Sequence, residues 1–121
     1  MPYIWQVKNK QVRKMATFGE FLRNERKKKG LNQSEFGQLF GIIMTDISKI
    51  ETGKKKFPFT SLEALAKFLG KDYLELKNLY VADKLVEEAH KYKCSDAVFT
   101  VAESQSKYLR NKNAKQGKIK F

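Results

Sequence analysis

The sequence predicts an all-α protein built around a helix-turn-helix, and three observations support this fold class. Oxygen-bearing residues recur three positions ahead of glutamates, a spacing typical of helix N-termini because each side chain satisfies a free backbone amide of the other residue. Apolar residues follow these pairs at helical spacing. Two glycines lie four residues apart within FGQLFGIIMTDISKIETG, residues 36–53. The one strand-like segment, YIWQV at residues 3–7, is interpreted as a short extended arm.

Four such pairs predict four helix starts. The pairs are Thr17 with Glu20, Asn32 with Glu35, Thr60 with Glu63, and Asp72 with Glu75. We expect the first helix to end near residue 28 before Gly30, and the helix that starts at Thr60 to end at Gly70. The helix that starts at Asp72 is expected to be short and to complete the head at about residue 79.

A further helix is predicted for residues 44–52. Ile42, Ile47 and Ile50 fall on one side of it, and Gly53 supplies the left-handed residue that ends it. The opposite side presents Met44, Thr45, Ser48 and Lys49.

Gly37 and Gly41 weaken the helical character of their segment, because each glycine in a helix interior costs roughly 1 kcal/mol relative to alanine. Two helices that cross steeply after a short turn need a glycine where the chain reverses and a small residue where the backbones approach. Gly41 suits the turn, and Gly37 suits the contact beneath the following helix. The pair therefore predicts a helix-turn-helix.

The sequence at this point resembles the lambda-repressor-like (Cro/C1, XRE-type) helix-turn-helix proteins, over about residues 17–79. The densest part is GLNQSEFGQLFGIIMTDISKIETGKKK, with Gln33 and Glu35 opening the second helix and Ile47 to Gly53 reading IS.IE.G. The resemblance implies a five-helix head whose third helix enters the major groove of DNA. Most relatives have alanine at position 37, Ser or Thr where Ile43 stands and a polar residue where Met44 stands, so no target base is inferred.

The resemblance also implies roles for individual residues. The third helix would place Met44, Thr45, Ser48 and Lys49 against base edges. Phosphate contacts would come from Asn32, Gln33, Lys54 and Lys55. Asp46 is expected either to bind a neighbouring side chain or to accept from a cytosine amine. Arg26 would pair with Glu51 as a structural brace between the first and third helices.

The charge predicts a polyanionic partner, most plausibly double-stranded DNA, with an anionic membrane surface as the weaker alternative. The net charge is +12, and ten of these charges lie in the two ends, residues 1–17 and 107–121. We therefore divide the chain into a basic N-terminal arm (1–16), a helix-turn-helix DNA-binding domain (17–79), a helical dimerisation segment (80–110) and a basic flexible tail (111–121). Met15, just ahead of Thr17, is an alternative start to Met1.

Two more helices are predicted after the head, over residues 82–92 and 96–109. Both carry apolar stripes, and exposed stripes of this kind favour association. We expect a homodimer, since two heads can read two half-sites of an operator. Its interface is predicted to consist of Leu85, Ala89, Val98, Val101, Ala102 and Tyr108.

The sequence gives no sign of an enzyme, a metal site or a bound cofactor. His90 and Cys94 are the right distance apart for two ligands of one ion, but zinc sites need three or four ligands and no other His or Cys exists. No phosphate-binding loop or dinucleotide fingerprint is present. No run of about 18 apolar residues and no secretory signal is found, so a cytoplasmic location is expected.

The leading hypothesis for the function is a sequence-specific transcriptional regulator, either a small restriction–modification controller or a phage-type repressor. The alternative is an antitoxin that binds a toxin and also regulates its own operon. A basic nucleoid-type protein without sequence preference is the third hypothesis, and a well-formed reading helix argues against it.

Overall fold

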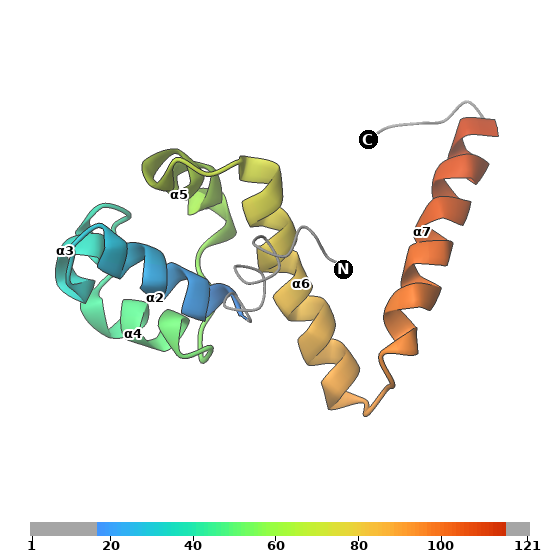
Figure 1. The fold of residues 1–121 in the computed structure, drawn as a ribbon, viewed down its shortest axis with the longest axis horizontal. Helices are drawn as coiled ribbons and strands as arrows, with labels where there is room; N and C mark the ends of the chain where they lie inside the picture. The colour runs from blue at the N-terminus through green and yellow to red at the C-terminus, as the bar shows by residue number, and fades with distance from the viewer. Residues whose placement is uncertain (1–16, 116–121) are drawn as a thin grey trace, which may run out of the picture. The chain divides into compact units, whose positions relative to one another are not determined.

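The computed structural model describes residues 17–115, and all the regular secondary structure in this part is helical, which confirms the predicted all-α fold class (Figure 1). The predicted basic arm, its strand-like segment and residues 116–121 lie outside the described residues. The chain divides into two compact units, with the boundary after Asp83. The elements in order are α2 (Phe18–Lys28), α3 (Gln33–Gln38), α4 (Met44–Glu51), the 3-10 turn η1 (Phe59–Ser61), α5 (Leu62–Leu69), α6 (Tyr73–Lys91) and α7 (Ala97–Lys115).

The first two helix starts are confirmed by their hydrogen bonds. The Thr17 hydroxyl oxygen accepts from the backbone N–H of Glu20 at 3.1 Å. Asn32 and Glu35 form a reciprocal pair, in which each side chain accepts from the other residue's backbone N–H, at 2.7 and 2.9 Å. These bonds satisfy amides that the first helical turn leaves unpaired, so both helices start where the sequence places them.

The start of α5 differs from the prediction that Thr60 would cap it. Thr60 lies inside η1, because the backbone N–H of Ser61 donates to the carbonyl of Pro58 at 3.0 Å and turns the chain before α5 begins. Ser61 occupies the capping position without a side-chain hydrogen bond. The end of α5 is as predicted, since Gly70 is left-handed with φ of 67°.

The helix after Asp72 is longer than predicted. Its start is confirmed by the bond from the Glu75 backbone N–H to the Asp72 carboxylate at 3.0 Å. The two helices expected on either side of residue 80 are one helix, α6, because no glycine or proline interrupts the backbone hydrogen bonds there. Similarly, α7 continues to Lys115 and not to residue 109, so residues 111–115 of the segment predicted as a flexible tail are helical.

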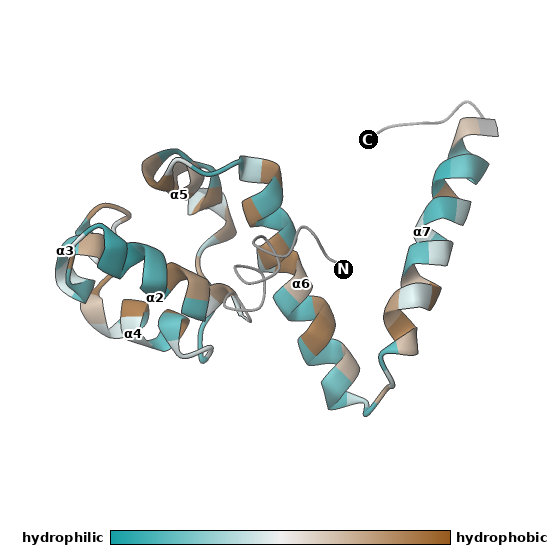
Figure 2. Cartoon of the chain, viewed as in Figure 1, coloured by the Kyte–Doolittle hydropathy of each residue, from teal (hydrophilic) through white to brown (hydrophobic). Residues whose placement is uncertain are grey.

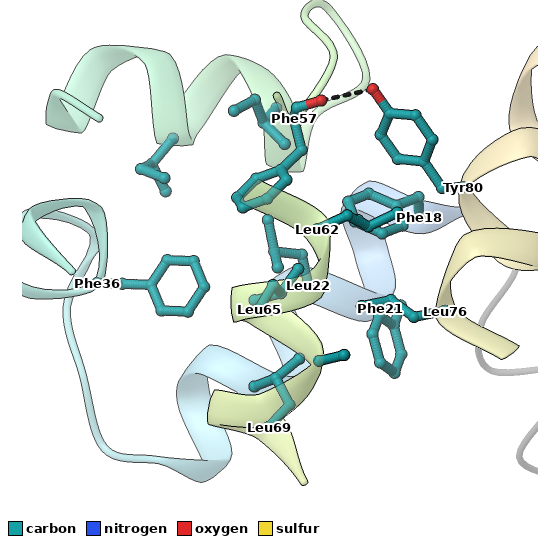
Figure 3. Packing of buried hydrophobic residues seen from close by; sticks show 13 residues of the cluster. Phe18, Phe21, Leu22, Phe36, Phe57, Leu62, Leu65, Leu69, Leu76 and Tyr80 are labelled. Carbon is teal, nitrogen blue, oxygen red and sulfur yellow. Dashed lines mark hydrogen bonds between the residues drawn. The ribbon is translucent and has the colours of Figure 1, made fainter. Parts of the chain in front are cut away.

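The core of the head lies among α2, α3, α4, α5 and the first turns of α6 (Figure 3). Its largest fully buried side chains are Phe36, Phe57, Leu22, Ile47, Leu62 and Leu65. The ring of Phe18 meets the ring of Tyr80 edge to face at 5.2 Å, and the Tyr80 hydroxyl donates to the carbonyl of Phe57 at 2.5 Å. These contacts fix α6 against the loop that follows α4.

A second link between α6 and the head involves Asp83. Both of its carboxylate oxygens accept from the backbone N–H of Phe18, at 3.1 and 3.0 Å. This amide is the first of α2 and has no partner within its own helix. A negative charge at this end of α2 is also favoured by the helix dipole. The start of α2 is therefore held by a residue 65 positions away in the sequence.

Candidate nucleic-acid interface

The turn between α3 and α4 depends on two glycines in the roles predicted for them. Gly41 has φ of 68°, a left-handed conformation that residues with a side chain rarely adopt. At Gly37 an added Cβ would overlap the backbone oxygen of Ile42 and lie 3.1 Å from Cγ1 of Ile47. The absence of a side chain at position 37 lets the chain pass close to α3 before it enters α4. Together the glycines set the angle at which α4 leaves the turn.

Helix α4 has a buried side and an exposed side. Ile47 and Ile50 belong to the core, with 0% and 2% of their surface exposed. The predicted base-contacting residues lie elsewhere on the helix: Met44, Thr45 and Lys49 are exposed and Ser48 is half-buried. Helix α4 packs against α2 and α3 (Figure 1), and the residues of its other side are exposed. The side chains available to a ligand on α4 are therefore those that the sequence pattern placed there.

A buried polar network holds α4 to α2 and α3. The guanidinium group of Arg26 binds the carboxylate of Glu51, and its Nη1 donates to the carbonyl of Leu31 at 2.8 Å. The side-chain amide of Gln33 also donates to Glu51, at 3.1 Å. Glu51 therefore accepts from both the arginine of α2 and the first residue of α3. The arrangement orients Gln33, which the sequence resemblance assigned to a phosphate.

Asp46, in the first turn of α4, forms a salt bridge of 2.8 Å with Lys55, which follows the end of this helix. Of the two roles predicted for Asp46, contact with a neighbouring side chain is the one that the structure shows. Lys55, predicted to contact phosphate, is thereby partly neutralised. Lys54 and Asn32 are exposed and lie at the end of α4 and the start of α3.

Comparison with known proteins identifies the fold of this region. A family model described as helix-turn-helix matches residues 22–76. This part of the chain is a helix-turn-helix domain of the Cro/C1 type. No curated protein and no solved structure matches the chain. Members of this family are DNA-binding transcriptional regulators, so the exposed side of α4 is the candidate DNA-reading surface of the helix-turn-helix domain.

The helix-turn-helix domain also depends on a glycine that sequence reasoning missed. A Cβ added to Gly19 in α2 would lie 2.5 Å from the backbone oxygen of Ile50 and 2.7 Å from that of Glu51. The end of α4 thus approaches the backbone of α2 directly. A single glycine near a helix start carries no signal of a partner 31 residues away, so only the structure reveals this contact.

Ile43 is a second residue of the domain for which the sequence pattern predicted no role. It occupies the capping position of α4 and provides no side-chain hydrogen bond. Its side chain is 66% exposed, next to Met44 at 52%. The sequence contained a signal, because the family resemblance implies Ser or Thr where Ile43 stands.

All six predicted dimer residues lie in the second compact unit, residues 84–121. Ala89 is an exception to the prediction that they form an open surface, because it is only 7% exposed within the single chain and is already covered. Val98 is half-buried. The other four residues are exposed: Leu85, Val101, Ala102 and Tyr108. Figure 2 shows apolar residues along α6 and in the first turns of α7, with mostly polar residues after them.

Other kinds of site find little support in residues 17–115. This stretch contains no group of three or more His, Cys, Asp or Glu side chains that could hold a metal ion. Cys94 is an exposed free thiol. None of the helices that the structure describes is long and apolar enough to cross a membrane.

Proposed function

We propose that the protein is a sequence-specific transcriptional regulator that binds double-stranded DNA as a homodimer, with α4 in the major groove. The observation that carries this proposal is the exposed side of α4, which projects from a turn whose angle two glycines set. A helix presented in this way fits the width of the major groove. Recognition of DNA would place the protein in the cytoplasm, and no cofactor is needed for it.

The exposed side of α4 offers different chemistry at its two ends. Lys49 can donate to O6 and N7 of a guanine, and Thr45 can donate, accept or present its methyl group. Met44 is an apolar group that fits a thymine methyl. Ser48 is half-buried and lies beside Lys49, so it can reach a base edge or a phosphate.

The proposed phosphate contacts lie on either side of α4. Gln33 has one amide hydrogen on Glu51, which leaves the second free to donate to a phosphate at the start of α3. Asn32 precedes it and Lys54 follows α4. Lys55 would exchange its contact with Asp46 for a phosphate, so its net gain on binding DNA should be smaller than that of Lys54.

The homodimer is proposed from the apolar side chains of the second unit. Val101 and Tyr108 of α7 are 54% and 62% exposed, and Leu85 of α6 is 53% exposed. Large apolar side chains left in water favour association. A two-fold contact would use the same surface on both copies and join two DNA-binding heads.

Selection of bound sites from random duplex DNA tests the proposal directly. A regulator should yield one recurrent sequence, symmetric if the protein is a dimer, and should bind it at least about a thousandfold more tightly than random DNA. Light scattering on the free protein measures the oligomeric state separately. If no sequence is enriched and binding depends only on salt, the protein is a nonspecific DNA-binding protein and the proposal is wrong.

The exposed apolar residues of α7 also support a second candidate function, that of an antitoxin. The same side chains would suit a toxin in place of a second copy of the chain. Purification from the native source, followed by mass measurement of the intact complex, distinguishes the two. A second small protein bound at equal stoichiometry would favour the antitoxin, and a complex of two identical chains would favour the regulator.

A further inference from the structure

Ile43 and Met44 form an exposed apolar pair at the start of α4. They are adjacent in sequence, and 66% and 52% of their respective surfaces are exposed. Neither belongs to the core cluster or to the residues packed against it. Two large apolar side chains exposed to water at one helix start are unfavourable for an isolated domain. Their presence therefore needs a reason other than packing within the head.

Local helix stability does not provide this reason. Ile43 is the capping residue of α4, and it leaves the free amides of the first turn without a side-chain acceptor. Isoleucine is among the least favourable residues at such a position, whereas Ser, Thr, Asn and Asp are the most favourable. The chain therefore has isoleucine where a polar residue would stabilise the helix more and expose less apolar surface.

The polar groups near Ile43 and Met44 limit the kinds of ligand that the two side chains can bind. Asp46 is the acidic residue of the first turn of α4, and its carboxylate is engaged by Lys55 at 2.8 Å. The one carboxylate at the start of α4 is thus already engaged and is less available to the amino groups of adenine or cytosine. Further along the same helix Lys49 is exposed, and Lys54 follows the helix end. The positive charges of these lysines, together with the two apolar side chains, complement a ligand in which negatively charged phosphates lie on either side of an apolar group.

One apolar group in the major groove of DNA has this setting, the methyl group on C5 of thymine. We propose that Ile43 and Met44 together contact thymine methyl groups, and that this contact sets the base preference at the position facing the start of α4. The inference rests on the proposed DNA-binding function and adds the class of base that the surface reads. Cytosine methylated at C5 presents the same methyl group on a different pattern of donors and acceptors.

The test uses the intact protein and the DNA site obtained by selection from random duplexes. Each thymine of that site is replaced in turn by uracil, which removes the methyl group and keeps every hydrogen-bonding group. We expect the affinity to fall about three- to fivefold at one or two thymines of each half-site. This is the factor expected when one methyl group that is buried in the complex is removed. At the remaining thymines the affinity should not change.

Variants connect this effect to the two side chains. In the double variant Ile43→Ser/Met44→Ala the loss caused by uracil should shrink to less than about twofold at the same thymines, because the contact is already absent. Leu74→Ala is the matched control, since Leu74 is 60% exposed but belongs to α6. It should keep the full uracil effect.

Ile43→Ser also separates recognition from folding. Serine can cap α4, so the variant should melt at a higher temperature than the parent protein while binding the selected site less tightly. A lower melting temperature together with an unchanged uracil effect would show that Ile43 serves the stability of the head, and the proposal would fail.

The remaining outcomes distinguish this inference from the function on which it rests. If selection enriches no site, the proposed function fails, and the inference fails with it. If a site is enriched but no thymine responds to uracil, only the inference is overturned. Tighter binding to a 5-methylcytosine pair than to the thymine pair at the responsive position would overturn the assignment to thymine. A change in molecular mass on light scattering, without a change in the uracil effect, would assign the pair to contact between copies of the chain.

Discussion

The guanidinium group of Arg26 makes two hydrogen bonds to the carboxylate of Glu51, from Nε at 2.6 Å and from Nη2 at 3.1 Å. The side chains are only 8% and 2% exposed, so the pair is almost completely withdrawn from water. Leu31 and Gln33 complete the network with one hydrogen bond each. The network therefore joins α2, α3 and α4, and it holds α4 in its orientation.

Removal of one partner of this pair should be strongly destabilising. We expect Arg26→Met to lower the free energy of unfolding by about 3–5 kcal/mol, because it leaves the Glu51 carboxylate buried without a cation. Urea denaturation measures the change. The double variant Arg26→Met/Glu51→Met should recover part of the loss, and Lys28→Ala is the control, since it removes an exposed cation bound to Glu25 and should cost less than about 1 kcal/mol. Equal losses in the Arg26 and Lys28 variants would contradict the importance of the buried pair.

Gly19→Ala should destabilise the head although alanine normally stabilises a helix. The added methyl group would lie 2.5 Å from the backbone oxygen of Ile50, so α2 and α4 must move apart. Overpacking of this kind costs about 1–3 kcal/mol. Thermal melting is the measurement, and Asn24→Ala, an exposed position of the same helix, should be neutral or slightly stabilising. A stabilised Gly19→Ala variant would show that the two helices are not in close contact.

Tyr80 should make the stability of the head depend on pH in the alkaline range. Burial raises the pKa of the Tyr80 hydroxyl above its ordinary value of 10.0, while the positive charge of Lys56 lowers it by a smaller amount. Below pH 10 both the folded and the unfolded chain keep the proton. Above it the unfolded chain loses the proton first, so stability falls as the pH rises through the folded pKa.

Comparison of the parent protein with Tyr80→Phe isolates this contribution. The variant loses the hydrogen bond to the carbonyl of Phe57 and should be about 1 kcal/mol less stable at pH 8. Between pH 9 and 11 its melting temperature should fall less steeply than that of the parent protein. Parallel curves for the two proteins would remove Tyr80 as the titrating group.

Lys49 and Lys54 should affect DNA binding in different ways. Lys49→Ala should weaken binding to the selected site by about 1–3 kcal/mol and leave binding to random DNA unchanged, because a base contact carries sequence information. Lys54→Ala should weaken binding to every sequence. It should also reduce the slope of log binding constant against log salt concentration by about one. Fluorescence anisotropy at several salt concentrations measures both. Equal losses on the two kinds of DNA for Lys49→Ala would make Lys49 a phosphate contact.

A charge at the centre of the proposed dimer surface should separate the two copies. Val101→Glu places a carboxylate opposite itself in a two-fold contact, so we expect a folded monomer that binds one half-site weakly. Thr100→Glu is the matched control, since the neighbouring residue is also exposed and points to another side of α7. Light scattering and gel shift are the measurements. A dimeric Val101→Glu protein with parental affinity would place the interface elsewhere and favour the antitoxin function.

Much of the head follows from the sequence because its signals are local. The pair of Asn32 and Glu35 reports hydrogen bonds between residues three apart, and Gly41 reports a backbone conformation of a single residue. The alternation of buried Ile47 and Ile50 with exposed Lys49 follows from the geometry of one helix. Such features need no knowledge of the rest of the chain.

The errors have two different causes. Thr60 and Glu63 have the spacing of a helix start, but the turn formed by Pro58 and Ser61 places Thr60 inside η1. The break expected near residue 80 does not occur, because no glycine or proline interrupts α6 there; Tyr80 also packs into the core, and Asp83 binds the start of α2. Neither contact can be inferred from residues that are close in sequence.

The sequence by itself determined the helix-turn-helix, the exposed residues of α4 and the basic character of the chain, because turn chemistry, helical periodicity and charge are properties of neighbouring residues. Only the tertiary structure decided which of these residues are engaged: Lys55 is bound by Asp46, Gln33 is oriented by Glu51, and Gly19 lies against the end of α4. These contacts join residues 9 to 32 positions apart, and their formation depends on how the packed helices bring the side chains together in space.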